Sequence, residues 1–284
     1  MKRTLALLAL CALLIPAAQA QDSATLKKVR DSKSLALGYR TDAAPFAFKD
    51  ESGAPTGYSV DLCKRIAAGI ERALKLDKLD VKWVPVTAGN RIQQVTSGAV
   101  DLECGTTTVT LGRQEQVDFS NLIFVDGGAV LLRGTDGTSR RLSDLAGKSI
   151  GVMAGTTTET ALRAALKDRL IDAKVVIVKD EPEGLAALEA SKIDGLAGDR
   201  ISLAGLVVRA NSATKFAMTG DDFSFEPYGL MMRRDPGFRL AVNRALSQVY
   251  RSDAIGEIYG RWFGALGKPG PLLTAMFYLN AFGE

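Results

Sequence analysis

Residues 149–167 read SIGVMAGTTTETALRAALK and contain the pattern on which the fold prediction depends. The apolar run Ser149–Met153 predicts a strand, and Thr157–Lys167 repeats apolar residues at helical spacing after a loop rich in glycine and threonine. Val175–Val178 is the next apolar run and predicts a second strand. A strand, a helix and a strand at this spacing form a right-handed crossover, so the two strands are expected to be parallel.

The same alternation extends over most of the chain. Before residue 149, strands are predicted at Leu35–Tyr39, Phe46–Phe48, Pro55–Tyr58, Val81–Pro85, Asp101–Cys104 and Ala129–Arg133, and helices capped by Ser59 and around Arg91–Ser97. After residue 178, helices are predicted at Glu183–Ser191, from about Ile201, near Phe238–Tyr250 and at Ala254–Trp262, and strands at Gly195–Ala197 and Tyr228–Met232. Residues from Pro269 onward give no clear pattern. Alternation of this kind predicts an α/β protein with doubly wound, mainly parallel sheets.

The length of the chain favours two lobes rather than one domain. We expect one lobe to comprise residues 21–124 and 221–284, and the other residues 125–220. The chain would then cross between the lobes near Phe124–Gly127 and again near Phe216–Phe223. Ligands of open α/β sheets bind beyond the carboxyl ends of the strands, so a cleft between the lobes is the expected binding site.

Residues 1–20 have the pattern of a secretory signal peptide. Lys2 and Arg3 precede an apolar run from Leu5 to Ile15, and Ala17-Ala18-Gln19-Ala20 offers a cleavage site. This run is too short to span a bilayer of about 30 Å, and no later run reaches the roughly 18 uncharged apolar residues of a membrane helix. We therefore expect the mature chain to begin at Gln21 and to be secreted into an oxidising compartment.

The composition excludes several classes of function. The 36 basic and 32 acidic residues give a net charge of +4, and loss of Lys2 and Arg3 with the signal peptide leaves +2, which is too balanced for a nucleic-acid-binding protein. The chain has no histidine, which excludes histidine-based catalytic triads and histidine zinc sites. The mature chain keeps only Cys63 and Cys104, so no metal or other cofactor is expected. These two cysteines form a disulfide only if the fold brings them close together.

Polar residues with no evident role in the core follow several predicted strands. They are Arg40, Arg91, the run Gly105–Thr108 with Arg113 five residues later, the run Gly155–Thr158, and Asp199. Arginine binds a carboxylate through charge-assisted hydrogen bonds of about 1.5–3 kcal/mol each, and amides at a helix N-terminus favour an anion. Each residue alone is compatible with a surface role, and Thr156 with Glu159 is also a capping box. Together they favour a site for a small zwitterionic or anionic molecule.

The segment Gly57–Ile66, which reads GYSVDLCKRI, resembles the signature of family 3 solute-binding proteins, the periplasmic receptors of polar amino-acid ABC transporters. Ser59 stands where an acidic residue is usual. The similarity extends from about Ser34 to Phe263, and Ile193–Asp199 resembles the stretch before the family's ligand-binding aspartate. The resemblance implies a type II periplasmic binding protein, in which two lobes joined by a two-stranded hinge close on an amino acid. It also implies a periplasmic monomer that catalyses no reaction and has an ABC transporter permease as its partner.

Within the family, several segments are similar to glutamate/aspartate-binding proteins. They read GYR at 38–40, NRI at 90–92, FSNLIFV at 119–125, and ECGTTT at 103–108 followed by Arg113. This resemblance implies that Arg113, with Thr108, binds the α-carboxylate of the ligand. Asp199 and Thr106 would bind its α-ammonium group. Arg40 and Arg91 would bind its side-chain carboxylate, with Thr157 contributing from the second lobe.

Two residues depart from this subfamily: Ala88 replaces a serine, and Glu181 replaces a histidine. Because a glutamate would repel an anionic ligand, we expect Glu181 to pair with Arg40 or Arg91 or to point away from the ligand. Glutamate or aspartate is the expected ligand, and glutamine or asparagine is the alternative. An enzyme similar to cyclohexadienyl dehydratase, with Glu181 as general acid, and a sensor lobe of a larger receptor are two further alternatives, because fold alone does not specify function.

Overall fold

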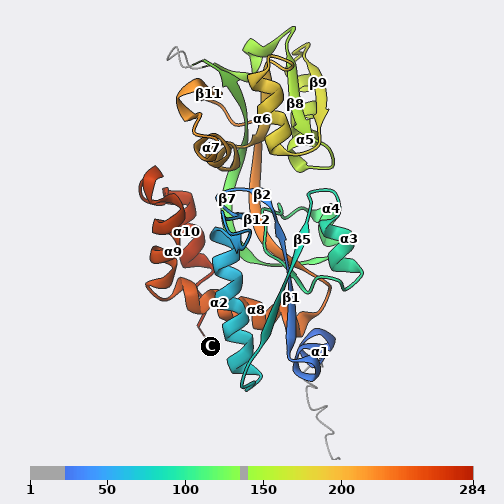
Figure 1. Ribbon diagram of the computed structural model, residues 1–284, viewed down its shortest axis with the longest axis vertical. Coiled ribbons are helices and arrows are strands. Elements are labelled where there is room, and N and C mark those ends of the chain that lie inside the picture. Colours follow the sequence, from blue (N-terminus) through green and yellow to red (C-terminus); the bar gives the residue numbers. More distant parts are fainter. Residues whose placement is uncertain (1–22, 135–139, 284) are drawn as a thin grey trace, which may run out of the picture.

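The computed structural model describes residues 23–134 and 140–283, so the predicted signal peptide lies outside the described residues. The chain forms two lobes that are stacked along the long axis of the molecule and joined by two long strands (Figure 1). These strands are β7 (Asp118–Arg133) and β12 (Ser224–Met232). The predicted two-lobed α/β architecture is confirmed. Within the described ranges, no helix has the length and apolar character needed to cross a membrane.

Lobe 1 is built around β1 (Ser34–Arg40), which pairs in parallel with β5 (Asp80–Val86) on one side and β6 (Leu102–Glu103) on the other. A small antiparallel sheet of β2 (Asp42–Ala43), β3 (Ala47–Lys49) and β4 (Pro55–Thr56) contains the predicted hairpin. The helices of this lobe are α1 (Ala24–Ser32), α2 (Tyr58–Ala73), α3 (Arg91–Thr96), α4 (Leu111–Gln114), α8 (Pro236–Tyr250), α9 (Ala254–Phe263) and α10 (Pro271–Leu279), and η3 (Gly264–Leu266) follows α9.

Lobe 2 contains the strand, helix and strand from which the α/β fold was predicted. Residues 149–178 form β8 (Ser149–Met153), α5 (Thr157–Asp168) and β9 (Lys174–Val178), and β8 and β9 pair in parallel as expected. β10 (Gly195–Asp199) lies parallel to β8 on its other side. The other elements are η1 (Leu142–Leu145), α6 (Glu181–Glu189), α7 (Arg200–Arg209), η2 (Ala213–Lys215) and β11 (Phe216–Met218).

The hinge consists of β7 and β12, which pair antiparallel from Asp118 opposite Met232 to Gly128 opposite Ser224. Beyond this pairing, β7 continues into lobe 2 and pairs with β10 and β11. The expected return crossing near Phe216–Phe223 is wrong. Phe216–Met218 satisfies its backbone hydrogen bonds by pairing with β7 inside lobe 2, and the chain returns along β12. The boundaries at residues 124 and 220 stay predictions.

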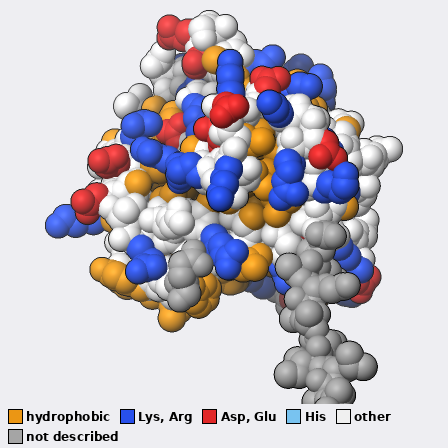
Figure 2. Space-filling model, turned by 90° about the horizontal axis from the view of Figure 1, so that it is seen from below, with side chains coloured by type: hydrophobic (Ala, Val, Ile, Leu, Met, Phe, Trp, Pro, Cys, Tyr) orange, Lys and Arg blue, Asp and Glu red, His pale blue; other side chains and the backbone are white. Residues whose placement is uncertain are grey.

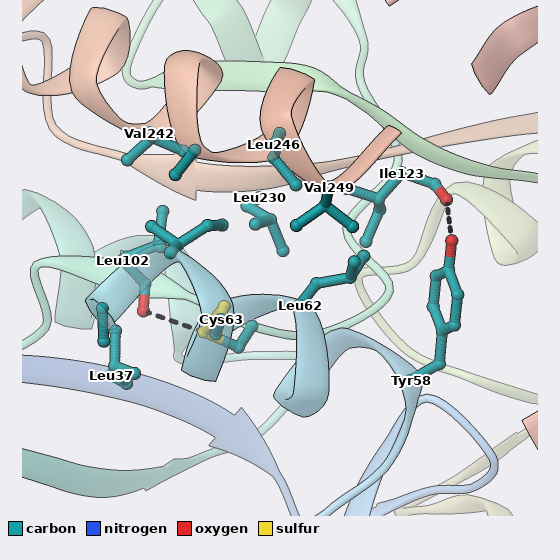
Figure 3. Close-up of a cluster of buried hydrophobic side chains, with 14 of the residues drawn as sticks. Leu37, Tyr58, Leu62, Cys63, Leu102, Ile123, Leu230, Val242, Leu246 and Val249 are labelled. Atoms are coloured by element: carbon teal, nitrogen blue, oxygen red, sulfur yellow. Dashed lines mark hydrogen bonds between the residues drawn. A yellow bond between two sulfur atoms is a disulfide. The ribbon is translucent and has the colours of Figure 1, made fainter. Parts of the chain in front are cut away.

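The core of lobe 1 lies between α2, the strands and α8 (Figure 3). Leu37, Leu62, Leu230 and Leu246 are completely buried there. Cys63 on α2 forms a disulfide with Cys104, whose Cα atom is 6.2 Å away, so the pairing left open by the sequence is present. The disulfide connects α2 to the residue just before Gly105–Thr108 and therefore anchors that polar loop to the core.

The start of α2 differs from the prediction. The helix begins at Tyr58 after Gly57, whose φ of +127° is accessible mainly to glycine, and a Cβ atom at this position would lie 2.2 Å from the Phe46 carbonyl oxygen. Ser59 is not the cap, because its buried hydroxyl donates to the Gly105 carbonyl at 2.9 Å. Ser59 thus holds the same loop that the disulfide anchors.

Three helices were not predicted: α1, α4 and α10. Helix α10 is apolar on both faces, and Leu272, Tyr278 and Leu279 remain exposed, so it lacks the periodic pattern of a half-buried helix. In the view from below, basic and acidic side chains are interspersed over the surface, and apolar side chains are visible both near the centre and along one edge (Figure 2).

Candidate functional site

A cavity of about 380 Å³, including its opening to solvent, lies between the two lobes. Lobe 1 contributes Arg40, Arg91, Thr106 and Thr108, and lobe 2 contributes Val152, Met153, Thr156, Thr157, Thr158, Glu181, Ala197, Gly198 and Asp199. Seven of the eight predicted site residues line this cavity, and Arg113 does not. The seven lining residues meet because the carboxyl ends of the parallel strands in both lobes face each other across the cleft.

Arg40, the last residue of β1, is already paired within the protein. Its Nε and Nη2 atoms donate to the two carboxylate oxygens of Asp42 at 2.9 and 2.7 Å, and Nη2 also reaches Met153 Sδ in lobe 2 at 3.7 Å. Burial alone would lower the pKa of Arg40, but the hydrogen bonds and charge of Asp42 outweigh burial and raise it. The charge of Arg40 is therefore largely compensated before any ligand arrives.

Arg91, the first residue of α3, is in the opposite situation. Only 3% of its surface is exposed, and in the described part of the chain its Nε and Nη1 atoms have no hydrogen-bond partner. Burial lowers the pKa of Arg91 to about 10, against the opposing charge of Glu103, so the side chain remains a cation at neutral pH. Since a buried charge without partners is strongly unfavourable, an anionic group in the cavity would stabilise Arg91.

Arg113 lies on α4, which Thr110 caps by accepting a hydrogen bond from the Arg113 amide at 3.1 Å. Its Nη1 atom donates to the Thr108 carbonyl at 2.8 Å, so it supports the loop that carries Thr106 and Thr108. Burial lowers the pKa of Arg113, while Glu226 and Glu103 act in the opposite direction. Its expected contact with the ligand α-carboxylate stays a prediction.

Glu103, which is completely buried on β6, lies below the same loop. Its Oε2 atom accepts from the Thr107 hydroxyl at 2.7 Å, and its Oε1 atom has no partner within the described residues. Burial raises the pKa of Glu103, and the charge of Arg91 opposes this shift. A Cβ atom on Gly105 would lie 2.1 Å from Glu103 Oε1, so the loop passes directly over this carboxyl group.

The loop at the start of α5 presents Thr157 to the cavity. Thr156 caps the helix by accepting from the Glu159 amide at 3.0 Å, and Glu159 Oε2 accepts from the Gly155 amide at 2.9 Å. Thr156 is therefore the helix cap, but the expected capping box is incomplete, because Glu159 accepts from the Gly155 amide and not from the Thr156 amide. Gly155 has a φ of +72°, a left-handed conformation that favours glycine. This turn leaves Thr157 as the first helical residue, in the cavity wall.

Asp199, at the end of β10, is held by two hydroxyl groups. Its Oδ1 atom accepts from Thr158 at 2.7 Å, and its Oδ2 atom accepts from Tyr228. Burial and the charge of Glu226 raise the pKa of Asp199, and the two hydrogen bonds oppose this. Burial and the charge of Asp199 raise the pKa of Asp126 in turn. Such a cluster of carboxyl groups favours a cation at this end of the cavity.

Glu181, the first residue of α6, lines the cavity and is 5% exposed. Its Oε2 atom has no hydrogen-bond partner, and the described residues offer it no ion pair, so the expectation that it pairs with an arginine or points away is wrong. Arg40 does not pair with Glu181 because its guanidinium group already forms an ion pair with Asp42. Burial raises the pKa of Glu181 to about 8, with Arg40 opposing only in part, so its neutral form predominates at pH 7.

Glu226 and Tyr228 also hold residues of the site, and neither was predicted from the sequence. Both lie on β12, which was expected to begin only at Tyr228. The sequence signal was weak, since a single glutamate in a short strand is normally solvated. Thr158, next to a predicted residue, was also not assigned. In the described ranges, no group of three or more cysteine, aspartate or glutamate side chains could hold a metal ion.

The chain is similar to known proteins over most of its length. It matches the model of the bacterial extracellular solute-binding proteins, family 3, over residues 35–265. It is 35% identical over 241 residues to the L-glutamate/L-aspartate-binding protein of Pseudomonas aeruginosa, covering 84% of this chain and 80% of that protein. It is 31% identical over 252 residues to the glutamate/aspartate import solute-binding protein of Salmonella typhimurium, covering 87% and 83%. These relatives are binding proteins and not enzymes, which argues against the dehydratase alternative.

Solved structures show the same fold. An ancestral arginine-binding protein bound to glutamine superimposes with a TM-score of 0.71 at 29% identity, covering 82% of this chain and 98% of that one. The resemblance therefore includes both lobes and the hinge. Since the family model covers most of the sequence and two relatives exceed 30% identity, the chain belongs to family 3 of the bacterial extracellular solute-binding proteins.

Proposed function

We propose that this protein is the periplasmic receptor of an ABC importer for an acidic amino acid, glutamate or aspartate. The observation that carries the proposal is Arg91, a buried cation in the cavity with two unpartnered nitrogen atoms. A carboxylate of the ligand would supply the missing hydrogen bonds. The names of the relatives in Pseudomonas aeruginosa and Salmonella typhimurium support the same ligand class.

The two ends of the cavity differ in charge, as an amino acid requires. The carboxyl group of Asp199 would accept from the α-ammonium group, and Arg91 would bind the side-chain carboxylate, with Arg40 nearby. Arg113 would attract the α-carboxylate, and Thr106, Thr108 and Thr157 would supply hydroxyl groups. We take residues 1–20 as a signal peptide and the mature protein as a monomer.

The mechanism is capture by closure. Contacts between the lobes exist away from the cavity as well: the Arg209 guanidinium lies 4.4 Å from the centre of the Phe48 ring, and a Cβ atom on Gly205 would lie 2.4 Å from the Ala44 carbonyl oxygen. A ligand that touches both lobes favours this closed arrangement by its differential affinity. The closed surface would then be the one that an ABC transporter permease binds.

Calorimetry of the mature protein with each of the twenty amino acids tests the proposal. We expect glutamate or aspartate to bind with a Kd of about 1 μM or lower, about −8 kcal/mol, and glutamine to bind at least tenfold more weakly. A protein that binds glutamine, asparagine or a basic amino acid best has a different specificity. A protein that binds no amino acid at all contradicts the proposed function itself.

One observation favours the neutral alternative, glutamine or asparagine. The unpartnered Oε2 atom of Glu181 would accept a hydrogen bond from a side-chain amide, but it would repel a carboxylate if it were ionised. The neutral form of Glu181 removes this objection, because a protonated carboxyl donates a hydrogen bond to the carboxylate of an acidic ligand. The two ligand classes therefore predict opposite responses to pH.

Glutamate affinity is expected to fall as pH rises, because the site binds it with Glu181 protonated. A carboxyl group in an open, hydrated cleft has a pKa near 4.3, whereas burial in the closed cavity raises that of Glu181 to about 8. Closure therefore takes up a proton when the pH lies between these two pKa values. The free energy that this proton contributes to binding is fully present below about pH 4 and is lost as pH rises through 8. We expect the glutamate Kd to rise at least tenfold between pH 6 and pH 8.

The control is Glu181→Gln, which keeps a hydrogen-bond donor but does not titrate. In this variant the rise in the glutamate Kd over the same range should be at least fivefold smaller than in the wild type, and the rise that remains belongs to Asp126 and Asp199, whose pKa values burial also raises. Equal pH profiles for the two proteins would show that Glu181 does not bind the proton. A wild-type affinity for glutamate that increases with pH would contradict a protonated Glu181 directly.

A further inference from the structure

Glu226 connects the two lobes through hydroxyl groups that line the cavity. Its side chain, on hinge strand β12, is 1% exposed. Its Oε2 atom accepts from the Thr108 hydroxyl of lobe 1 at 2.6 Å and from the Thr157 hydroxyl of lobe 2 at 2.7 Å. Its Oε1 atom accepts from the Ser224 hydroxyl at 2.6 Å. Figure 1 shows β12 running between the two lobes.

These hydrogen bonds decide what the two threonines can offer a ligand. A hydroxyl group has one proton to donate and two lone pairs that accept. An ionised carboxylate only accepts, and hydrogen bonds to it are shorter and stronger than those between neutral groups. The two hydroxyl oxygens also lie 3.1 Å from each other, but their contacts with Glu226 are shorter and charge-assisted. Because Thr108 and Thr157 thus both direct their protons to Glu226, each retains only acceptor capacity toward the cavity.

Acceptor groups suit an ammonium ion and not a carboxylate. Asp199 also faces the cavity, so its carboxyl group and the hydroxyl groups of Thr108 and Thr157 together make this region rich in acceptors. The role expected for Thr108, to help Arg113 bind the α-carboxylate, would then fall to a group other than its hydroxyl, and it stays a prediction. Glu226 itself is absent from the cavity wall and thus acts only through the residues that it holds.

We propose that Glu226 is a positioning residue that turns the hydroxyl groups of Thr108 and Thr157 into acceptors for the α-ammonium group of the ligand. The site then selects amino acids over dicarboxylates that lack this group. The inference rests on the proposed function, since it needs an amino-acid ligand. The inference adds Glu226, a residue that does not touch the ligand, to the proposed site. It also assigns to the site a preference for ligands with an α-ammonium group, which Glu226 and the two threonines provide together.

The test compares glutamate with glutarate, the same dicarboxylate without the amino group, by calorimetry at pH 7. In the wild type, we expect glutarate to bind at least a thousandfold more weakly than glutamate. In Glu226→Leu, the side chain has a similar size but accepts no hydrogen bond, so the protons of both threonines become free for the ligand and the ratio of the two Kd values should fall at least tenfold. Ser224→Ala is the matched control, because it removes the hydroxyl bound to Oε1 and leaves both threonine bonds to Oε2 in place. It also removes the acceptor of the Gly128 amide, and its ratio should stay within threefold of the wild type.

A double-mutant cycle separates this role from a structural one. Thr157→Val removes one of the two hydroxyls and should lower the ratio. Adding Thr157→Val to Glu226→Leu should change the ratio by less than Thr157→Val does alone, because both substitutions act through the same hydroxyl group. Thr157→Val also keeps the inference testable if Glu226→Leu does not fold. Melting temperatures identify a variant that is merely unstable.

The outcomes distinguish this inference from the proposed function. A wild type that binds no amino acid overturns both. A wild type that binds glutarate as well as glutamate overturns the inference and leaves the proposed function standing. A wild type that discriminates, together with a Glu226→Leu variant that discriminates equally well, overturns only the role of Glu226. Independent effects of the two substitutions would likewise show that Glu226 does not act through Thr157.

Discussion

Replacing Arg91 by methionine is expected to weaken glutamate binding at least a hundredfold and glutamine binding less than tenfold. Arg91 is buried, and its Nε and Nη1 atoms find no partner among the described residues, so the side-chain carboxylate of glutamate would be its main anionic partner. Removing one member of a buried charge pair costs about 2–5 kcal/mol, and about 1.4 kcal/mol corresponds to a factor of ten. Methionine fills similar space without charge. Calorimetry with both ligands at pH 7 measures the difference.

Arg163→Met is the matched control, because it removes the same charge from an exposed position on α5. Arg163 forms an ion pair with Glu159 at 3.0 Å on the surface of lobe 2. We expect this variant to bind both ligands within twofold of the wild type, since surface ion pairs contribute little. If Arg91→Met weakened glutamate and glutamine equally, Arg91 would not recognise the charge of the side chain.

Substitution of Asp199 by asparagine is expected to weaken the binding of every amino acid more than a hundredfold. The carboxyl group of Asp199 is fixed in place by Thr158 and Tyr228, and burial raises its pKa, so an ammonium ion in the cavity would stabilise its charge. Asparagine keeps the shape and one acceptor oxygen but removes the charge that the ammonium group requires. Loss of a buried, hydrogen-bonded charge pair accounts for an effect of this size.

Calorimetry with glutamate, aspartate and glutamine measures this loss, and melting temperatures show whether the variant is folded. Asp168→Asn, at the exposed end of α5, removes the same charge outside the cavity and should leave all three affinities within twofold. A loss for glutamate alone would indicate that Asp199 recognises the side chain. Affinities of Asp199→Asn within threefold of the wild type would exclude Asp199 from the ammonium site.

The alternating pattern determined the fold to a large extent. The stretch from Ser149 to Val178 forms a strand, a helix and a parallel strand, because apolar periodicity reports which face of each element is buried. The same pattern located much of the site. Arg40 and Asp199 end strands, and the carboxyl ends of parallel strands share one edge of a sheet, so polar residues at these positions converge without further information.

Tertiary structure alone decided which groups are partners. Arg40 has Asp42 as its partner rather than Glu181, so Glu181 remains unpaired in the cavity. Cys63 and Cys104 form a disulfide because the fold brings their Cα atoms to 6.2 Å from each other. The chain returns to lobe 1 along β12 because β11 pairs with β7 inside lobe 2. Glu226 meets Thr108 although 118 residues separate them. Periodicity depends on neighbours within a few residues, whereas a hydrogen bond between distant residues forms only where the whole fold brings donor and acceptor within about 3 Å.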